Sequence, residues 1–227
     1  MRNAVPSLLA TPEPPHLGTG RPDVPLAEQA ASRAVAARLE VYADEVRRLV
    51  DAALTVMRRT GSLDPRVGDI VRASGLSNQA FYRHFRGKDE LLLAVLDDGR
   101  RRLVGYLAAR MARVEAGAPR VRAWIEGVLE QARNEEAAAN TRPFAVNGAR
   151  LADQFPEQSA HSRELVVAPL REAVADAGGD SARDADSIYQ LAFGFMNDAL
   201  ARRERPSDAD VEHVVAFALA GLRQPEV

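Results

Sequence analysis

The sequence contains no cysteine, no long apolar run and almost no lysine. Without cysteine the chain has no disulfide, no thiolate metal ligand and no cysteine nucleophile, which excludes redox chemistry on thiols. No stretch reaches the roughly 18 apolar residues that a membrane span requires, so no membrane partner is expected. Among the 30 basic residues only Lys88 is a lysine, a bias that we attribute to a GC-rich coding sequence.

Signatures of catalysis, metal binding and secretion are missing as well. The four histidines are not spaced as HxxxH and none lies beside an acid in a zinc-ligand pattern, so no metal site is expected. The chain has no GxSxG motif, no phosphate-binding loop and no close pair of nucleophile and base, so neither enzymatic activity nor a cofactor is expected. The amino-terminal part lacks the apolar stretch of a secretory signal, which predicts a cytoplasmic location.

The charge is distributed unevenly along the chain. The net charge is −2, which by itself argues against nucleic acid as a partner. Residues 43–88, however, carry nine basic and five acidic side chains, whereas residues 89–227 carry 17 basic and 23 acidic ones. A small basic segment joined to a larger acidic one suggests a division of labour, in which the basic segment approaches a polyanion.

The first part of the chain changes character near residue 26. Residues 1–26 contain six prolines and no apolar periodicity, which predicts a disordered arm. From residue 26 to Gly61 there is neither proline nor glycine, and apolar residues recur at helical spacing. This pattern predicts one long helix, or a short leading helix followed by a core helix, ended by Gly61.

Two short helices separated by a tight turn are predicted next. Asp64 before Pro65 is a typical helix start, because aspartate caps free amides and proline is tolerated at the first helical position. Gly75 supplies a left-handed turn residue, and Ser77 can cap the following helix. Two helices of about eight or nine residues around such a turn form a helix-turn-helix, whose second helix can enter the major groove of DNA.

The remainder of the chain also reads as helices. Asp89 and Glu90 occupy the first turn of a helix that runs to about Val114, where the helix dipole favours acidic groups. Further helices are predicted near 119–135, 136–152, 157–177, 181–203 and 207–223, broken by Pro119, Pro143, Pro156, Gly178-Gly179 and Pro206. No stretch alternates as a strand would, so the predicted fold class is all-α.

The segment from Val67 to Leu91, VGDIVRASGLSNQAFYRHFRGKDEL, resembles the DNA-binding segment of the tetracycline-repressor (TetR) family of bacterial regulators. The family pattern is matched at Ile70, Gly75, Ser77, Tyr82, His84, Phe85, Lys88 and Leu91, with conservative replacements at Val71, Ser74, Leu76 and Phe81. The resemblance covers about 45 residues, and the order Y-x-H-F-x-x-K is its specific part.

The resemblance implies three parts and a DNA-binding regulator without catalytic activity. The parts are a disordered arm at 1–26, a three-helix DNA-binding domain at 27–87 and a larger effector-binding and dimerisation domain at 88–227. Phe81 and Phe85, spaced i and i+4, are expected in the core of the three-helix unit. Asn78 and Gln79 at the start of the recognition helix can pair with adenine, and Ala80 or the Tyr82 ring can touch a thymine methyl. The Tyr82 hydroxyl, His84 and Lys88 offer hydrogen-bond donors to phosphate. The predicted DNA-binding residues are Arg66, Asn78, Gln79, Ala80, Tyr82, His84 and Lys88.

The sequence departs from the family pattern at three places. Gln79 replaces a usual glycine, Pro65-Arg66 stands where a threonine pair is common, and Gly68 lies where the family often has a contacting side chain. Arg66 is interpreted as a replacement for a lost phosphate contact.

The last two predicted helices are apolar on more than one face. A surface helix needs only one apolar stripe, so a wider one indicates that a second body covers it. By resemblance, two copies pair through these helices and present two recognition helices to a pseudo-palindromic operator in double-stranded DNA. The predicted dimer residues are Ile188, Leu191, Phe195, Val211, Val215, Leu219 and Leu222.

The middle helices would then enclose a pocket for a small lipophilic effector, neutral or singly anionic. Its predicted lining residues are Trp124, Arg142, Phe144, Asn147, Tyr189 and Phe193, with Phe155 and Asn197 as further candidates. Core packing is an open alternative for Tyr189 and Phe193. The run Arg100-Arg101-Arg102 is interpreted as a solvated helix face rather than a second DNA-binding patch.

The leading hypothesis is a homodimeric, ligand-responsive transcription repressor. Two other classes stay open, namely a helical interaction module that keeps the helix-turn-helix only as structure, and an enzyme built on a helical bundle.

Overall fold

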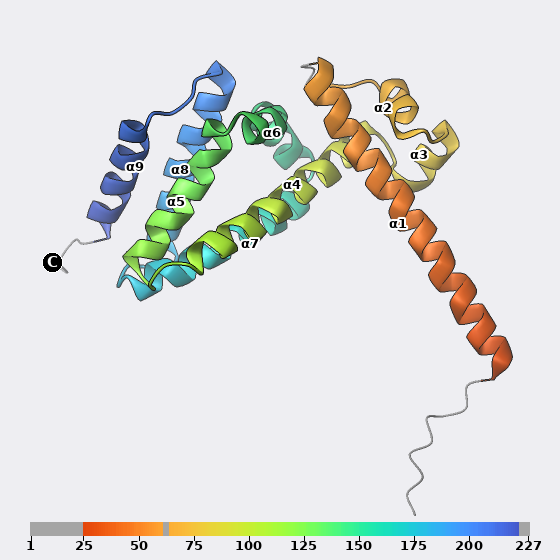
Figure 1. Ribbon diagram of the computed structural model, residues 1–227, viewed down its shortest axis with the longest axis horizontal. Helices are drawn as coiled ribbons and strands as arrows, with labels where there is room; N and C mark the ends of the chain where they lie inside the picture. The colour runs from red at the N-terminus through yellow and green to blue at the C-terminus, as the bar shows by residue number, and fades with distance from the viewer. Residues whose placement is uncertain (1–24, 61–63, 223–227) are drawn as a thin grey trace, which may run out of the picture. The chain divides into compact units, whose positions relative to one another are not determined.

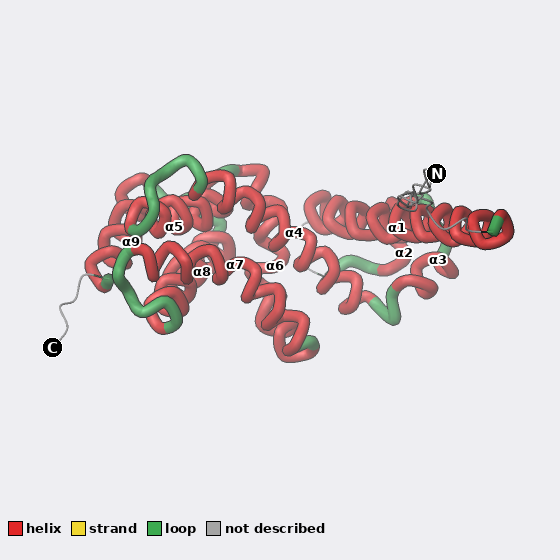
Figure 2. The backbone as a smooth tube through the Cα atoms, turned by 90° about the horizontal axis from the view of Figure 1, so that it is seen from below, coloured by secondary structure: helices red, strands yellow, loops and turns green. Residues whose placement is uncertain are grey.

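The computed structural model describes residues 25–60 and 64–222, apart from the side chains of residues 146 and 147. Within these ranges every regular element is a helix, as the tube in Figure 2 shows, which confirms the all-α class. Residues 1–24, most of the segment for which we predict a disordered arm, lie outside the described residues. None of the described helices is both long and apolar enough to cross a membrane.

The described residues divide between two units, one that extends up to residue 42 and one that begins at residue 43. Helix α1 (Leu26–Thr60) begins in the first unit as a single helix, not as two. Its segment 26–42 is exposed throughout, including the large apolar side chains of Leu26, Val35 and Leu39. The part of α1 beyond residue 42 belongs to the second unit and buries one apolar face.

In the second unit a helix-turn-helix follows α1, formed by α2 (Val67–Ser74) and α3 (Asn78–His84) (Figure 1). Gly75 ends α2 in the left-handed conformation, with φ 66° and ψ 21°. Ser77 caps α3 by accepting a hydrogen bond from the Ala80 amide at 3.1 Å. Both turn residues therefore have the roles that the sequence predicts.

A small apolar core holds α1, α2, α3 and the start of α4 together. Phe81 and Phe85 lie in it as predicted, with ring centroids 5.9 Å apart, beside Leu49, Ile70 and Leu91. Because α3 has only seven residues, its stability depends on this packing and not on the helix alone.

Helix α4 (Lys88–Met111) leads from the helix-turn-helix to the carboxyl-terminal helices (Figure 1). Asp89 and Glu90 occupy its first turn as predicted, where acidic groups interact favourably with the helix dipole. Leu91, Leu92, Val95 and Leu96 are buried near its start, and Leu107 and Met111 near its end. The same helix therefore contributes to three separate hydrophobic clusters.

Five further helices form the carboxyl-terminal part of the unit. They are α5 (Ala118–Arg133), α6 (Glu135–Gln154), α7 (Pro156–Asp176), α8 (Arg183–Arg202) and α9 (Asp208–Gly221). Helix α5 packs against α4, α6, α7, α8 and α9, so it is the central element of this part. Its Trp124 is fully buried and donates a hydrogen bond from Nε1 to the Val166 carbonyl of α7 at 3.2 Å.

Two local predictions from proline and aspartate were wrong. Pro143, expected to break a helix, lies buried inside α6, and Pro169 lies inside α7. Helix α2 begins at Val67 with Arg66 at its amino-terminal cap, so Asp64 does not cap it. The Asp64 carboxylate instead forms an ion pair with Lys88.

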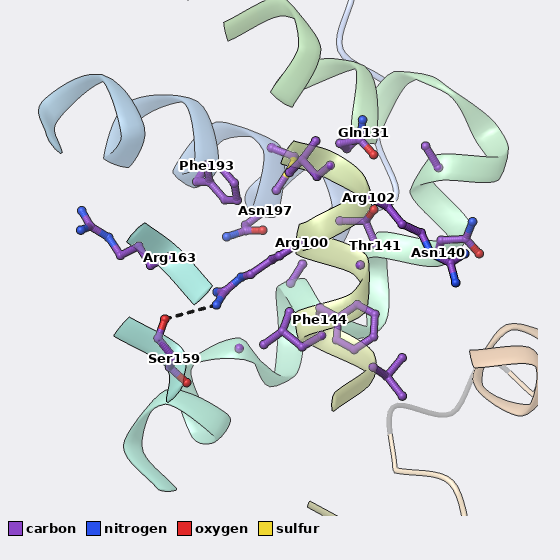
Figure 3. A pocket seen from close by; sticks show the side chains of 18 of the residues that line it. Arg100, Arg102, Gln131, Asn140, Thr141, Phe144, Ser159, Arg163, Phe193 and Asn197 are labelled. Atoms are coloured by element: carbon purple, nitrogen blue, oxygen red, sulfur yellow. Dashed lines mark hydrogen bonds between the residues drawn. The ribbon is translucent and has the colours of Figure 1, made fainter. Parts of the chain in front are cut away.

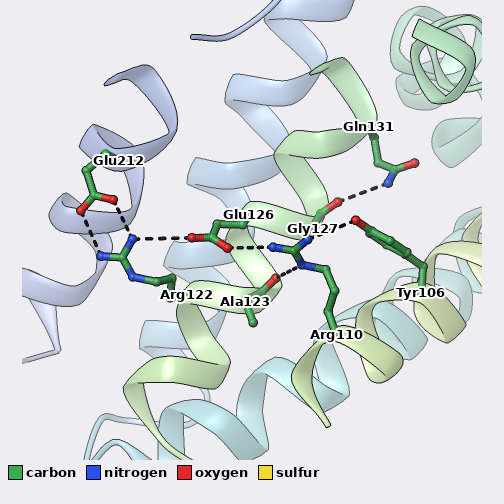
Figure 4. A network of polar contacts seen from close by, with 8 residues as sticks. All are labelled: Tyr106, Arg110, Arg122, Ala123, Glu126, Gly127, Gln131 and Glu212. Atoms are coloured by element: carbon green, nitrogen blue, oxygen red, sulfur yellow. Dashed lines mark hydrogen bonds and ion pairs between the residues drawn. The ribbon is translucent and has the colours of Figure 1, made fainter. Parts of the chain in front are cut away.

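A chain of ion pairs connects α4, α5 and α9 (Figure 4). The Arg122 guanidinium of α5 donates to both Glu212 carboxylate oxygens of α9, at 2.6 and 3.0 Å. Arg122 also faces Glu126 at 3.6 Å, and Glu126 accepts a hydrogen bond from Arg110 of α4 at 2.7 Å. The network ties the carboxyl-terminal end of α4 to the bundle.

Candidate functional site

Helix α3 presents a small set of polar side chains to the surface. Asn78, Gln79 and Tyr82 are exposed, with 61% of Tyr82 accessible to solvent. The Tyr82 ring packs edge-on against Phe81, with centroids 5.1 Å apart, so the ring is anchored while its outer side is free. These three residues lie where a recognition helix needs groups that reach base edges and phosphates.

Two predicted DNA-binding residues of the same helix are not on this surface. Ala80 is buried in the domain core. The side chain of His84 is only 8% exposed, and its Nε2 lies 2.6 Å from a carboxylate oxygen of Glu45 on α1. His84 therefore connects α3 to α1 through Nε2.

Glu45 binds two consecutive residues of α3. Its two carboxylate oxygens accept hydrogen bonds from Nη2 of Arg83 at 3.1 and 2.9 Å, in addition to the contact with His84. The hydrogen bond with His84, assisted by the charge of Arg83, lowers the pKa of the Glu45 carboxyl below its ordinary value. Sequence reasoning missed Glu45, because its partners lie 38 and 39 residues away and no local pattern connects them.

Arg48 fixes the turn of the helix-turn-helix. Its Nη2 donates a hydrogen bond to the Ser74 carbonyl at 2.7 Å, one residue before the left-handed Gly75. A Cβ at Gly75 would lie 3.2 Å from the same Nη2, so the close approach of Arg48 and the positive φ both favour glycine there. The orientation of α3 relative to α1 is therefore set by Arg48 at one end and Glu45 at the other.

The remaining predicted DNA-binding residues are the basic ones. Arg66 is exposed at the amino-terminal cap of α2, and Lys88 opens α4 as the ion-pair partner of Asp64. Within the described ranges neither Arg66 nor the exposed Arg86 forms an ion pair with a carboxylate. Both guanidiniums are available to phosphate.

A cavity of about 1040 Å³ lies between α4, α6, α7 and α8, with α5 and α1 contributing to its wall. Phe144, Tyr189, Phe193 and Asn197 line it as predicted (Figure 3). Tyr189 is also part of the core, where its ring stacks on Phe193 with centroids 4.4 Å apart. The volume is in the range of small-molecule binding sites.

Three other predicted residues are not among those that line this cavity. Trp124 is enclosed in the core, Phe155 lies beside a smaller surface hollow near Lys88, and Arg142 donates from Nε to the Leu200 carbonyl at 3.1 Å. The side chain of Asn147 lies outside the described part. Among the described residues no cluster of three or more His, Asp or Glu side chains is arranged to hold a metal ion.

The arginine run of α4 is divided between cavity and solvent. Arg101 and Arg102 are exposed, as expected of a solvated face, although Arg102 also borders the cavity, and Arg100 reaches into it. Its Nη1 donates to the Ser159 carbonyl of α7 at 3.4 Å, the contact dashed in Figure 3. The interpretation of the whole run as solvated was therefore wrong for Arg100.

The predicted dimer residues fall into two groups. Ile188, Val211 and Val215 are buried in the core of their own chain, so their side chains are not available to a second copy. The other four, all half-buried, pack at the margin of that core; they are Leu191, Phe195, Leu219 and Leu222. Phe217, which we did not predict, is 67% exposed on α9, because it lies off the apolar stripe that faces the core.

Comparisons with known proteins agree with the helix-turn-helix. Residues 49–95 match the family described as bacterial regulatory proteins, tetR family. Over 79 residues the chain is 37% identical to the HTH-type transcriptional regulator BetI of Brucella anthropi, an alignment that covers 35% of this chain and 41% of that protein. BetI of Brucella suis is 35% identical over 79 residues, covering 40% of its length. The chain thus spans about two fifths of the length of the curated relatives it matches.

Solved structures extend the likeness to the whole fold. A putative TetR-family transcriptional regulator from Mesorhizobium loti has a TM-score of 0.61 at 17% identity, covering 80% of this chain and 96% of that one. The fatty acid degradation regulator FadR from Bacillus halodurans has a TM-score of 0.60 at 18% identity, with 80% and 97% covered. At such identities the likeness establishes the arrangement of helices.

Proposed function

We propose that this chain, which belongs to the TetR family of bacterial regulators through its residues 49–95, acts as a homodimeric transcription repressor. In this proposal it binds a pseudo-palindromic operator and is released from it by a small lipophilic effector. The observation that carries the proposal is the recognition helix, whose exposed Asn78, Gln79 and Tyr82 stand on a helix that Glu45 and Arg48 hold in place.

The chemistry of these side chains suits the major groove. The amides of Asn78 and Gln79 each offer a donor and an acceptor, the combination that pairs bidentately with adenine. Tyr82 can donate to a phosphate or contact a thymine methyl with its ring. Arg66, Arg86 and Lys88 surround the helix with positive charge, which supplies affinity without sequence preference.

Dimerisation would place two such helices on one duplex. The half-buried apolar residues at the margin of the core and the exposed Phe217 leave apolar surface on α8 and α9. Burying this surface against a second copy with two-fold symmetry would create two equivalent half-site readers. A repressor of this kind works where the DNA is, so we expect it in the cytoplasm, and it needs no cofactor.

The effector would act through α4. This helix starts with Lys88 at the helix-turn-helix and passes the cavity at Arg100, about 18 Å further along at 1.5 Å per residue. A ligand that favours one placement of α4 changes the separation of the two recognition helices, and a duplex accepts only a narrow range of separations.

Selection from a random duplex library tests the proposal. We expect the purified protein to enrich a pseudo-palindromic sequence and to bind it with a steep dependence on salt. Asn78→Ala and Gln79→Ala should each cost about 1–3 kcal/mol against that sequence and relax the preference at one position of each half-site.

Matched variants separate phosphate contacts from general loss of charge. Lys88→Ala should lower the magnitude of the salt slope by roughly 0.9 per half-site. Arg202→Ala removes one cation from the exposed carboxyl-terminal end of α8, where Arg202 pairs with Asp198, and should leave the slope unchanged. Absence of any enriched sequence would contradict the proposed function.

A further inference from the structure

Arg100 is a cation inside a largely apolar cavity. It projects from the middle of α4, and Figure 3 shows it between Phe144, Phe193 and Ser159. Its one hydrogen bond among the described residues is the long contact from Nη1 to the Ser159 carbonyl, at 3.4 Å. A guanidinium has five N–H donors in a fixed fork, so most of its capacity is unused.

The sequence of α4 gives Arg101 and Arg102 acidic partners but not Arg100. Arg101 binds Asp97 and Arg102 binds Asp98, both at 2.7 Å and both four residues back. The residue four positions before Arg100 is the buried Leu96. Within residues 25–60 and 64–222, no carboxylate lies within ion-pair distance of Arg100.

The surroundings penalise the charge further. Burial lowers the pKa of the Arg100 guanidinium below its ordinary value, and the positive charge of Arg163 acts in the same direction, against the opposing effect of Tyr189 and Asp97. Arg163 is itself compensated, because it contacts Asp186 at 3.2 Å and lies over the Tyr189 ring, 4.5 Å from its centroid. The two acids of the wall, Asp98 and Glu130, are not among the groups that act electrostatically on Arg100.

A second polar group beside Arg100 also lacks a partner. The Ser159 hydroxyl is buried without a hydrogen bond in the described structure, in a residue that is only 8% exposed and lines the cavity. The Asn140 side-chain oxygen, on another part of the wall, is unpaired as well. Buried polar groups are nearly always satisfied in proteins, so unpaired polar atoms that line a cavity point to a ligand.

The rest of the wall indicates the body of that ligand. Leu96, Leu103, Phe144, Phe193 and Met196 contribute apolar surface around the two polar groups. A planar guanidinium beside a hydroxyl matches the two oxygens of a carboxylate, which accepts the parallel N–H donors of arginine and a further hydrogen bond. Of the three arginines of the wall, Arg102 and Arg163 have carboxylate partners and Arg100 has none among the described residues, so the cavity suits one further negative charge.

We infer that the cavity binds a lipophilic monocarboxylate, with its headgroup on the Arg100 guanidinium and the Ser159 hydroxyl and its apolar body against Phe144 and Phe193. Only one part of the inference rests on the proposed function, namely that this ligand is the effector that releases the protein from DNA.

Binding of dodecanoate, compared with dodecan-1-ol and dodecylammonium, tests the inference directly. Trp124, the single tryptophan of the chain, lies 6.1 Å from Phe193 and 6.4 Å from Tyr189 between ring centroids, so its fluorescence reports on the filled cavity. We expect dodecanoate, below its micelle concentration, to bind the full chain about 10- to 100-fold more tightly than the alcohol, because its headgroup forms a charge-assisted hydrogen bond. The ammonium should bind weakest.

Paired variants assign the effect to Arg100. Arg100→Gln should remove most of the preference for dodecanoate while leaving the affinity for the alcohol unchanged, and Ser159→Ala should weaken dodecanoate by a smaller factor. Arg101→Gln removes the same charge from the next residue, on the solvent side, and should bind dodecanoate as the unmodified chain does. Melting temperatures establish that each variant is folded.

Two results would overturn the inference. The first is equal affinity for dodecanoate and dodecan-1-ol, which includes the case in which neither binds. The second is an Arg100→Gln variant that still prefers dodecanoate to the alcohol. Operator binding in the absence of dodecanoate is measured separately. Failure of the ligand assignment would leave the selected duplex intact, whereas failure of the proposed function would leave dodecanoate binding intact.

Discussion

Gly127 of α5 lies where α4 packs so closely that no side chain fits. A Cβ at this position would lie 2.5 Å from Cδ2 of Leu107, 3.3 Å from Cδ of Arg110 and 3.4 Å from Cε1 of Tyr106. Leu107 is fully buried, so its side chain has little space into which it could move. Gly127→Ala should therefore strain the contact that anchors the end of α4.

The net effect is a balance of two opposing contributions. Replacing glycine by alanine inside a helix stabilises by about 1 kcal/mol, because the unfolded chain loses conformational freedom. Overpacking a filled core costs roughly 1–3 kcal/mol. We expect Gly127→Ala to lose about 1 kcal/mol on balance, and Gly127→Val to lose more, because valine adds two further methyl groups to the same contact.

Gly105 provides the matched control. It lies on α4, exposed, and a Cβ there would have no neighbour within 4 Å. Gly105→Ala should therefore gain up to about 1 kcal/mol from helix propensity alone.

Thermal unfolding followed by Trp124 fluorescence measures both variants, since Trp124 lies three residues before Gly127 in the same core. In a chain of this size a change of about 1 kcal/mol shifts the melting temperature by roughly 2–4 °C. The two alanine variants should shift in opposite directions. A rise for Gly127→Ala similar to that of Gly105→Ala would refute the packing argument.

Two further predictions concern other surfaces. Glu45→Gln should weaken operator binding, because α3 loses its charged contacts to α1. His84 and Arg83 lower the pKa of Glu45, so the stabilisation is present above the ordinary carboxyl pKa and is lost as the pH falls from there through the lowered pKa. In circular dichroism melts, the melting temperature of the unmodified chain should therefore fall more steeply in acid than that of the variant. Phe217→Glu should convert the proposed dimer to a monomer, as measured by light scattering, because it places a charge on the apolar surface of α9. Val114→Glu, at another exposed apolar residue, should leave the dimer intact. If the Phe217→Glu variant is still a dimer, the interface lies elsewhere.

The parts of the fold that could be predicted from sequence are those determined by neighbouring residues. The turn at Gly75, the cap at Ser77 and the acidic first turn of α4 depend on one or two positions each, and all three appear as predicted. The prediction that Asp64 caps the following helix was wrong because its partner is distant in the sequence. Its local context is typical of a helix cap, but its carboxylate pairs with Lys88, 24 residues later.

The site residues that escaped prediction depend on contacts between distant helices. Consecutive arginines at 100, 101 and 102 point about 100° apart around a helix, so at most one or two can face a given neighbour. Which of them line the cavity depends on where the neighbouring helices lie, and that is not encoded in α4. The same holds for Arg142, whose partner is a carbonyl 58 residues away.

Arg100 and the packing of α4 together suggest how a bound carboxylate would be felt at DNA. At its far end α4 is held against α5 by Leu107 at Gly127 and by the ion pairs through Arg110, so displacement there is resisted. A headgroup that draws Arg100 toward Ser159 must then displace the other end, where Lys88 begins the helix beside α3. Such a ligand shifts the equilibrium only as far as its affinity differs between the two placements of α4. The Arg100 guanidinium provides that difference, because its contact with the anion depends on its position. Coupling of this kind typically amounts to about 1–3 kcal/mol, which corresponds to a loss of operator affinity of roughly 5- to 150-fold.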